Sequence, residues 1–317
     1  MRLFEAFKDG KREAVPDVPF QMLTALELGT EDWIEIAKNA KWHMTRMNLN
    51  TFKRHGVLDD KRMVKLIADR LRDPEEIRKA RAFPYQLMIA FLNTEDVPAE
   101  IRDALQDAVE TATDNVPEID GKVFVFPDVS GSMSSPVTGN RPGATSKVRC
   151  IDVAALITAS ILRKNRTAEV LPFENDVVSV RLNGRDSIMT NAAKLARIGG
   201  GGTNCSAPLR QINRHKETAD LLVYVSDNQS WIETQQRYYG SGATGTMAEF
   251  LELKKRSPKC KMVCIDIQPY GSSQAKECAD VLNVGGFSDQ VFEIVSDFAA
   301  GRLSSGHWVE EIERIDL

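Results

Sequence analysis

The second half of the chain alternates short apolar runs with helical segments, and this alternation constrains the fold more than any other feature. Four runs rich in β-branched and aromatic residues have the composition of buried strands: KVFVF (122–126), AEVLPF (168–173), LLVYVS (221–226) and KMVCIDI (261–267). Three segments between or after them have helical periodicity: residues 150–164, 187–198 and 246–256. This order predicts an α/β fold with a doubly wound parallel sheet.

The first part of the chain has a different pattern. Its apolar residues recur every three or four positions, as in Ile101, Leu105, Ala108 and Val109, which is typical of amphipathic helices. Helices are expected near residues 31–40, 42–55 (closed by Gly56), 60–72, 75–93 (with a break at Pro84) and 98–113. For a chain of 317 residues we therefore predict two domains, an all-α helical-repeat domain over residues 1–116 and the α/β domain over 117–317.

Charge is distributed unevenly along the predicted helices. The whole chain carries a net charge of −4, which argues against a protein that coats nucleic acid over its entire surface. Residues 38–81, however, contain thirteen Lys and Arg against six Asp and Glu, so this zone carries +7 between acidic flanks. A basic zone of this kind can attract phosphates, and it can equally be a solvated helix face that pairs with neighbouring acids.

Cysteine usage and hydropathy restrict the remaining classes. The five cysteines form no CxxC pair, which makes a zinc site or a disulfide framework unexpected. Cys260 and Cys264 are expected to face the core from one side of a strand. The sequence contains no apolar run long enough for a signal peptide or a membrane span, so we expect a cytoplasmic protein that does not contact membranes.

The sequence PDVSGSM (127–133) follows directly after a predicted strand. It supplies one carboxylate and two hydroxyls at alternate positions, with Gly131 easing the turn. The loop GGGGTN (199–204) and the predicted strand end VSDN (225–228) supply further oxygen side chains. Because ligands bind at the carboxyl ends of parallel strands, and hard oxygen donors suit Mg²⁺ or Mn²⁺, these segments predict a divalent metal site. The expected site residues are Asp128, Ser130, Ser132, Thr203 and Asp227.

These three segments, in this order, resemble the metal-ion-dependent adhesion site of von Willebrand factor A domains. By that resemblance Ser130, Ser132 and Thr203 are direct or nearly direct ligands, whereas Asp128 and Asp227 act in the same cluster, often through water. An open coordination position would accept a carboxylate from a protein partner. The family usually has an aliphatic residue before the aspartate, and this chain has Pro127, which removes a hydrogen-bond donor from the strand.

The segment WIEIAKNAKWHMTRMNLNTFKRHGVL (33–58) and the loop GGTNCSAPL (201–209) are similar to the Ro ribonucleoprotein family, in which a helical TROVE module precedes the A domain. The resemblance implies binding of small noncoding RNA, including Y RNA, and of misfolded RNA. It also implies a helical ring, which the short helical part of one chain cannot complete. Either the chain is a shortened relative, or several chains close a ring together.

The best place for RNA is the acid-free stretch of residues 38–55. Its expected RNA-binding residues are Lys38, Lys41, Arg46, Lys53, Arg54 and His55. Trp42 is as well suited to the core as to RNA. The cations further along are expected to pair with Asp59, Asp69 and Asp73; they are Arg62, Lys65, Arg70 and Arg72. Trp231, Tyr238 and Tyr239 offer rings for base stacking or for a protein contact, unless Trp231 folds under its loop.

An enzyme is not expected. The second aspartate of a dehalogenase-type phosphatase is replaced by Ser130, no GxSxG elbow occurs, and no histidine lies within the motifs. The alternative to a noncatalytic RNA-binding protein is a metal-dependent protein-interaction or adhesion-type scaffold, in which the helices only brace the A domain and bind no RNA.

Overall fold

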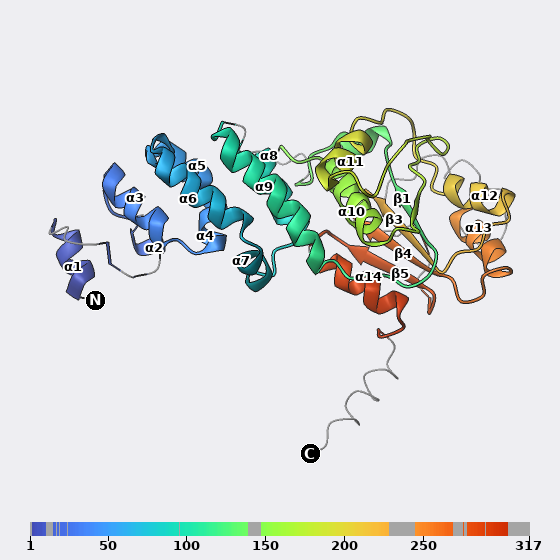
Figure 1. The fold of residues 1–317 in the computed structure, drawn as a ribbon. Helices are drawn as coiled ribbons and strands as arrows, with labels where there is room; N and C mark the ends of the chain where they lie inside the picture. Colours follow the sequence, from blue (N-terminus) through green and yellow to red (C-terminus); the bar gives the residue numbers. More distant parts are fainter. Residues whose placement is uncertain are drawn as a thin grey trace, which may run out of the picture. The chain divides into compact units, whose positions relative to one another are not determined.

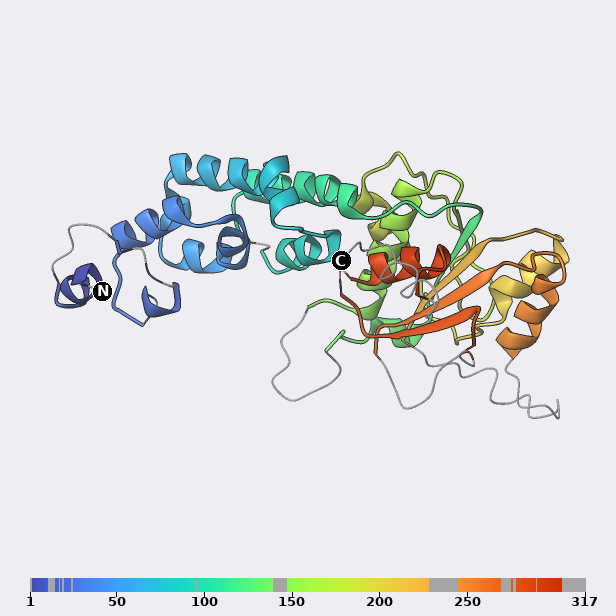
Figure 2. The same ribbon diagram turned by 90° about the horizontal axis from the view of Figure 1, so that it is seen from below.

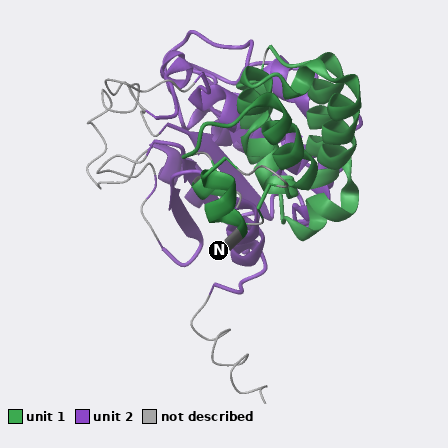
Figure 3. Cartoon of the chain, turned by 90° about the vertical axis from the view of Figure 1, so that its left-hand side faces the viewer, with its two compact units in different colours: residues 1–82, 86–112 green, residues 83–85, 113–317 purple. Residues whose placement is uncertain are grey.

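The structure is a computed structural model. It describes residues 2–10, 15–16, 18, 20–23, 25–94, 96–138, 147–227, 245–268, 275, 278–288 and 290–303. The segment with Trp231, Tyr238 and Tyr239 lies outside these residues, so the stacking interpretation stays a prediction. The chain divides into two compact units. One consists of residues 1–82 and 86–112, called the helical unit below, and the other, the α/β unit, of residues 83–85 and 113–317 (Figure 3).

Helices make up the first part of the chain (Figure 1). They are α1 (Arg2–Lys8), α2 (Phe20–Leu23), α3 (Thr30–Asn39), α4 (Trp42–Met47), α5 (Leu49–Arg54), α6 (Lys61–Arg72), α7 (Pro74–Lys79), α8 (Pro84–Leu92) and α9 (Ala99–Ala112). The predicted helix over 42–55 is divided at Asn48, whose side-chain amide donates to the Met44 carbonyl (2.8 Å) and so competes with the helical hydrogen bonds. Gly56 adopts a left-handed conformation (φ 75°) and ends α5, as predicted.

The core of the helical unit lies between α6 and α9. Both helices bury one stripe at helical spacing: Ile67 and Leu71 on α6, and Ile101 and Leu105 on α9, have no exposed surface. Trp42 is also a core residue at 2% exposure, and its indole nitrogen donates to the Leu71 carbonyl (3.1 Å). Burying these side chains is the main source of stability for a set of helices this short.

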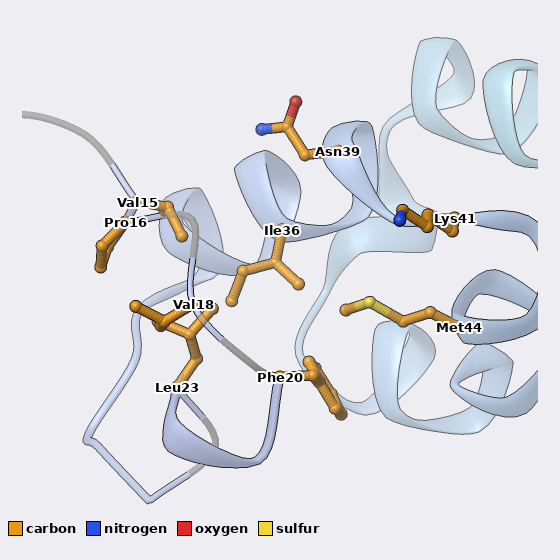
Figure 4. A pocket seen from close by; sticks show the side chains of 9 residues that line it. All are labelled: Val15, Pro16, Val18, Phe20, Leu23, Ile36, Asn39, Lys41 and Met44. Atoms are coloured by element: carbon orange, nitrogen blue, oxygen red, sulfur yellow. The ribbon is translucent and has the colours of Figure 1, made fainter. Parts of the chain in front are cut away.

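A cavity of about 770 Å³ lies in the helical unit beside α3 and α4. Figure 4 shows the Met44 side chain extending from α4 toward Ile36 of α3. The cavity is lined mostly by apolar side chains, with one amide and one ammonium group: Val15, Pro16, Val18, Phe20, Leu23, Ile36, Asn39, Lys41 and Met44.

The α/β unit contains five strands, β1 (Val123–Pro127), β2 (Glu169–Val170), β3 (Leu221–Ser226), β4 (Lys261–Asp266) and β5 (Val281–Gly285). Every neighbouring pair is parallel, in the order β2-β1-β3-β4-β5. The helices of this unit are α10 (Cys150–Lys164), α11 (Ile188–Leu195), α12 (Ala207–Arg214), α13 (Gly245–Lys254) and α14 (Val291–Ala299). The prediction of a helical region followed by a doubly wound parallel sheet is confirmed.

Helices cover both faces of the sheet. Figures 1 and 2 show α12 and α13 on one side, with α10, α11 and α14 on the other. Strand residues two apart face the same side, so Phe124, Phe126 and Tyr224 pack with Leu209 of α12 and Phe250 of α13. Cys260 and Cys264 belong to this cluster, which confirms that they face one core, and burial raises the pKa of Cys264 to about 12. Such thiols are inert packing groups.

Pro127 fits the sheet as the last residue of β1. The bonds from Leu171 N to Val125 O (3.0 Å), from Phe173 N to Pro127 O (3.1 Å) and from Val129 N to Phe173 O (2.9 Å) form one parallel ladder. The bond that a residue at position 127 would donate to the Leu171 carbonyl is missing, because proline has no N–H group. The ladder resumes at Val129, so the proline leaves the loop that follows β1 attached to the sheet.

Among the helices of the described residues, none combines the length and apolar character that a membrane span requires.

Candidate metal centre and nucleic-acid interface

The strand order places a switch point between β1 and β3. From β1 the chain crosses to β2 on one side, and then returns past β1 to β3 on the other side. Loops that leave two adjacent strands in opposite directions open a crevice at their carboxyl ends, where α/β proteins bind ligands. Asp128 follows β1 and Asp227 follows β3, and both side chains are almost completely buried, at 0% and 1% exposure. The fold therefore brings two of the predicted metal-site residues to the expected place.

Asp128 is held by hydrogen bonds from its own turn and from the end of β3. Its Oδ1 accepts from the Ser130 backbone N–H (2.8 Å), which closes the turn after β1. Its Oδ2 accepts from the Ser226 hydroxyl at the end of β3 (2.7 Å). Ser226 was missed by the sequence prediction because it lies within the apolar run LLVYVS. The two bonds fix the carboxylate orientation at the crevice.

The three predicted hydroxyl ligands lie next to one another. Thr203 Oγ1 donates to Ser130 Oγ (2.9 Å), and Ser130 Oγ lies 3.2 Å from Ser132 Oγ. Ser130 and Thr203 are buried at 2% and 1% exposure, whereas Ser132, in the 3₁₀ turn Gly131–Ser134, is half-buried. The hydroxyl row therefore runs from the interior toward the surface, as an open metal site requires.

The electrostatics of Asp128 suit a cation. Its pKa is raised to about 6, mainly by burial and to a smaller extent by the nearby Asp227 carboxylate, against the lowering effect of the hydrogen bonds from Ser226 and Ser130. None of these groups is positively charged, so a divalent cation would relieve the cost of burying two carboxylates side by side.

The donor set fits a hard cation. Within the part of the chain that the structure describes, no three or more His, Cys, Asp or Glu side chains gather as a metal cluster. The hydroxyl oxygens that lie together beside Asp128 are donors of the kind that favours Mg²⁺ or Mn²⁺ over zinc. Ser130, Ser132 and Thr203 would hold the ion, and Asp128 and Asp227 would fix its water ligands. Such an ion supplies Lewis acidity toward an incoming carboxylate.

The predicted RNA-binding residues do not all face solvent in the same way. Lys38 pairs with Glu35 (3.3 Å), and Lys53 lies 3.7 Å from Asp96. His55 is half-buried and stacks on Trp33, with ring centroids 4.3 Å apart. Lys41 and Arg54 are exposed, and neither forms an ion pair with any other described residue. Their RNA contacts stay predictions.

Arg46 belongs to a face of α4 and α5 that hydrogen-bonds to the chain around α8. Its guanidinium donates to the Gln86 carbonyl (3.1 Å) and lies 6.0 Å from the centre of the Trp42 ring. At neighbouring helical positions, His43 contacts the Ala80 carbonyl (3.1 Å) and Asn50 donates to the Asn93 carbonyl (2.8 Å). This face holds helices together, so we leave Arg46 out of the nucleic-acid interface.

Replacing Arg46 with alanine is expected to destabilise the helical unit by about 1.5–3 kcal/mol, the range for a lost hydrogen bond from a charged group. RNA affinity should be unchanged under conditions where the variant is folded. Arg54→Ala, an exposed control, should change stability by no more than about 0.5 kcal/mol while weakening RNA binding. Urea unfolding followed by tryptophan fluorescence measures the first effect. An Arg46 variant of full stability that loses RNA would reverse the two assignments.

The cations of α6 depart from the sequence prediction, which paired them with the wrong acids. Arg62 pairs with Asp60 (3.0 Å), and Arg72 lies 3.8 Å from Asp107. Arg70 donates to the Ala37 and Lys38 carbonyls and caps the C-terminus of α3. Arg62 thus uses the acid at the N-cap of its own helix, whereas Arg70 and Arg72 extend to other helices.

Lys61 and Lys65 are exposed cations of α6 that form no ion pair within the described residues. They lie one helical turn apart and therefore share a face of α6. The sequence prediction assigned Lys65 to pairing with nearby acids and did not consider Lys61, so neither was among the predicted RNA-binding residues. Together with Lys41 and Arg54 they define the cationic surface, the name used below for Lys41, Arg54, Lys61 and Lys65.

A five-stranded parallel sheet with helices on both faces, and with a hydroxyl and carboxylate site at its switch point, defines a von Willebrand factor A-type domain. A family model described as the Ro60 vWA domain matches residues 122–299, more than half of the chain. The chain therefore belongs to the Ro60 family, as its motifs indicated.

Two curated relatives extend the match beyond the A domain. The chain is 23% identical over 269 residues to the RNA-binding protein RO60 of Deinococcus radiodurans, covering 81% of this chain and 49% of that protein. It is 26% identical over 276 residues to the RNA-binding protein RO60 of Caenorhabditis elegans, covering 78% of this chain and 38% of that protein. The chain thus spans half or less of the length of these relatives.

The fold is shared with a solved structure. The crystal structure of the Deinococcus radiodurans RO (RSR) protein superposes with a TM-score of 0.70 at 19% identity, covering 94% of this chain and 66% of that one. A match over 94% of the chain takes in helices as well as the sheet.

Proposed function

We propose that this chain is a noncatalytic RNA-binding protein that binds structured small noncoding or misfolded RNA through its helical unit. The observation that carries the proposal is the similarity to two proteins named RNA-binding protein RO60. The first match covers 81% of the chain, which is more than the α/β unit contains, so it includes part of the helical unit.

The cationic surface supports this proposal physically. Its four side chains are exposed and form no ion pairs within the described residues, so their charges are free to neutralise phosphates. Each phosphate contact releases condensed counterions, which provides affinity without base readout. The expected partners are therefore RNAs distinguished by shape and unpaired ends rather than by a base sequence.

The α/β unit is proposed to bind Mg²⁺ or Mn²⁺ at the site formed by Asp128, Ser130, Ser132, Thr203 and Asp227. The support is the contiguous row of hydroxyls beside two buried carboxylates. The open position of the ion would receive a carboxylate from a protein partner, so the two units would bind different ligands.

Purification of the chain from cells tests the proposed RNA binding directly. We expect nucleic acid to copurify at low salt, visible as a raised ratio of absorbance at 260 nm to that at 280 nm and identifiable by sequencing. Copurified RNA should dissociate in high salt and should survive chelation of divalent metal. A preparation free of RNA that captures a protein only when Mg²⁺ is present would instead support the scaffold alternative.

A further inference from the structure

The glycine loop, residues 199–202, carries Thr203 to the metal site without following a strand, so its position depends on contacts with other loops. It lies between α11 and α12, and Gly200 has a backbone conformation (φ 125°) that other residues rarely adopt. We infer that Glu174, in the loop after β2, is the positioning residue that holds this loop so that Thr203 faces Ser130. The inference rests on the proposed metal site and extends it by one residue.

Glu174 contacts the loop on both sides of Thr203. Its Oε2 accepts from the Gly201 backbone N–H (2.8 Å), and its backbone carbonyl accepts from the Asn204 backbone N–H (2.8 Å). A charged acceptor makes the Gly201 bond stronger than a neutral one would. The two bonds fix the backbone on both sides of Thr203, so they set the position of its hydroxyl in the crevice.

The approach of Glu174 also explains why position 201 is glycine. A β-carbon built on Gly201 would lie 2.5 Å from Glu174 Cδ, so no other residue fits while the carboxylate keeps its place. Gly201 in turn accepts from the Gly131 backbone N–H (2.9 Å), which joins the glycine loop to the DVSGS turn. The Glu174 carboxylate is therefore linked through the backbone of Gly201 to the turn that carries Ser130 and Ser132.

The base of Glu174 is fixed by the sheet. Phe173, the preceding residue, donates to Pro127 O and accepts from Val129 N, so it continues the ladder beside β1. Phe173 itself has no exposed surface. The Glu174 carboxylate forms no ion pair within the described residues, so no described cation competes with the Gly201 N–H for it. A segment hydrogen-bonded to β1 therefore places one carboxylate against the backbone of the glycine loop, which is how a positioning residue works.

Titration of the full chain with Mn²⁺ alone, by isothermal calorimetry, tests the inference. Glu174→Ala should weaken Mn²⁺ binding about 10-fold or more, the range for removing a group that orients ligands. Glu174→Gln, which keeps an oxygen acceptor but not the charge, should restore most of the affinity, to within about threefold. The matched control is Asp176→Asn, since Asp176 lies in the same turn and its carboxylate accepts only from Val177 N (2.8 Å) among the described residues.

Thermal melting of each metal-free variant checks that it is folded. If folded Glu174→Ala binds Mn²⁺ as tightly as the unchanged protein, or if Asp176→Asn weakens binding equally, the inference is overturned.

Hydrogen exchange of the Gly201 amide, which donates to Glu174 Oε2, separates this inference from the metal proposal. Should the unchanged chain bind no Mn²⁺, the metal proposal fails, and exchange in the metal-free protein decides the role of Glu174. Faster exchange of the Gly201 amide in Glu174→Ala than in Asp176→Asn supports the positioning role. Equal protection in the two variants contradicts it.

Discussion

Replacing Asp128 with asparagine is expected to weaken Mg²⁺ or Mn²⁺ binding by at least about 10–100-fold while leaving the metal-free protein folded. The amide oxygen can still accept from Ser130 N–H, and the Ser226 hydroxyl can turn to accept from the new amide group. The substitution removes a buried negative charge beside Asp227, so the free energy of unfolding of the metal-free protein should not fall. Calorimetry with Mn²⁺ and thermal melting with a chelator measure the two effects.

The control for this variant is Asp186→Asn. Asp186 is in the same unit and pairs with Lys194 (2.8 Å), outside the site. It makes the same chemical change, and we expect metal binding to be unaffected. A folded Asp128→Asn protein that binds Mn²⁺ as tightly as the unchanged chain would exclude the proposed metal centre.

Neutralising Lys61 and Lys65 together should weaken RNA binding on the order of 25–65-fold at about 0.1 M salt. The estimate follows from counterion release, which makes each phosphate contact worth a factor of about 5 to 8 at that salt concentration. The slope of log K against log salt should fall by about 1.4–1.8 for the double variant Lys61→Gln/Lys65→Gln. Fluorescence anisotropy with one labelled structured RNA at four or more salt concentrations measures both quantities.

Arg78→Gln/Lys79→Gln is the matched control because it removes the same charge from an exposed helix of the same unit. These cations are paired with Glu75 and Glu76 on α7, respectively, so we expect only a small change in RNA affinity. An equal loss in both double variants would mean that only the total charge matters. In that case Lys61 and Lys65 would have no special place in the interface.

The alternation of strands and helices made the architecture predictable, because fully buried strands such as β1 and β3 consist of continuous apolar runs. β5 was missed since it contains Asn283 and is mostly half-buried, so its sequence VLNVG does not stand out. Helices α12 and α14 were also missed. Their positions depend on packing against the sheet, and the local sequence pattern does not reveal such packing.

The metal-site residues could be predicted from the sequence because several of these oxygen-bearing residues lie close together in it. DVSGS supplies three of them in one turn, and strand ends of a parallel sheet converge by geometry. Ser226 and Glu174 could not be predicted, because each hydrogen-bonds to a segment distant in sequence. Their hydrogen bonds span 98 and 27 residues, respectively. Only the three-dimensional register of the loops shows these contacts.

The basic zone shows the limit of composition. Thirteen cations in residues 38–81 look alike in the sequence, yet Arg46 and Arg70 bind backbone carbonyls and hold helices together. Lys61 and Lys65 remain unpaired among the described residues although acids lie close in sequence. Which cation turns inward depends on the helix that packs beside it, and this is a tertiary property.

Binding of the unchanged chain to a structured RNA, measured by anisotropy over a range of salt concentrations with and without EDTA, tests the central claim most directly. We predict measurable binding at low salt, a linear decrease of log K with log salt whose slope corresponds to about 2–4 phosphate contacts, and no effect of EDTA. Absence of binding at low salt, or an affinity that does not respond to salt, would contradict the assignment of RNA to the helical cations.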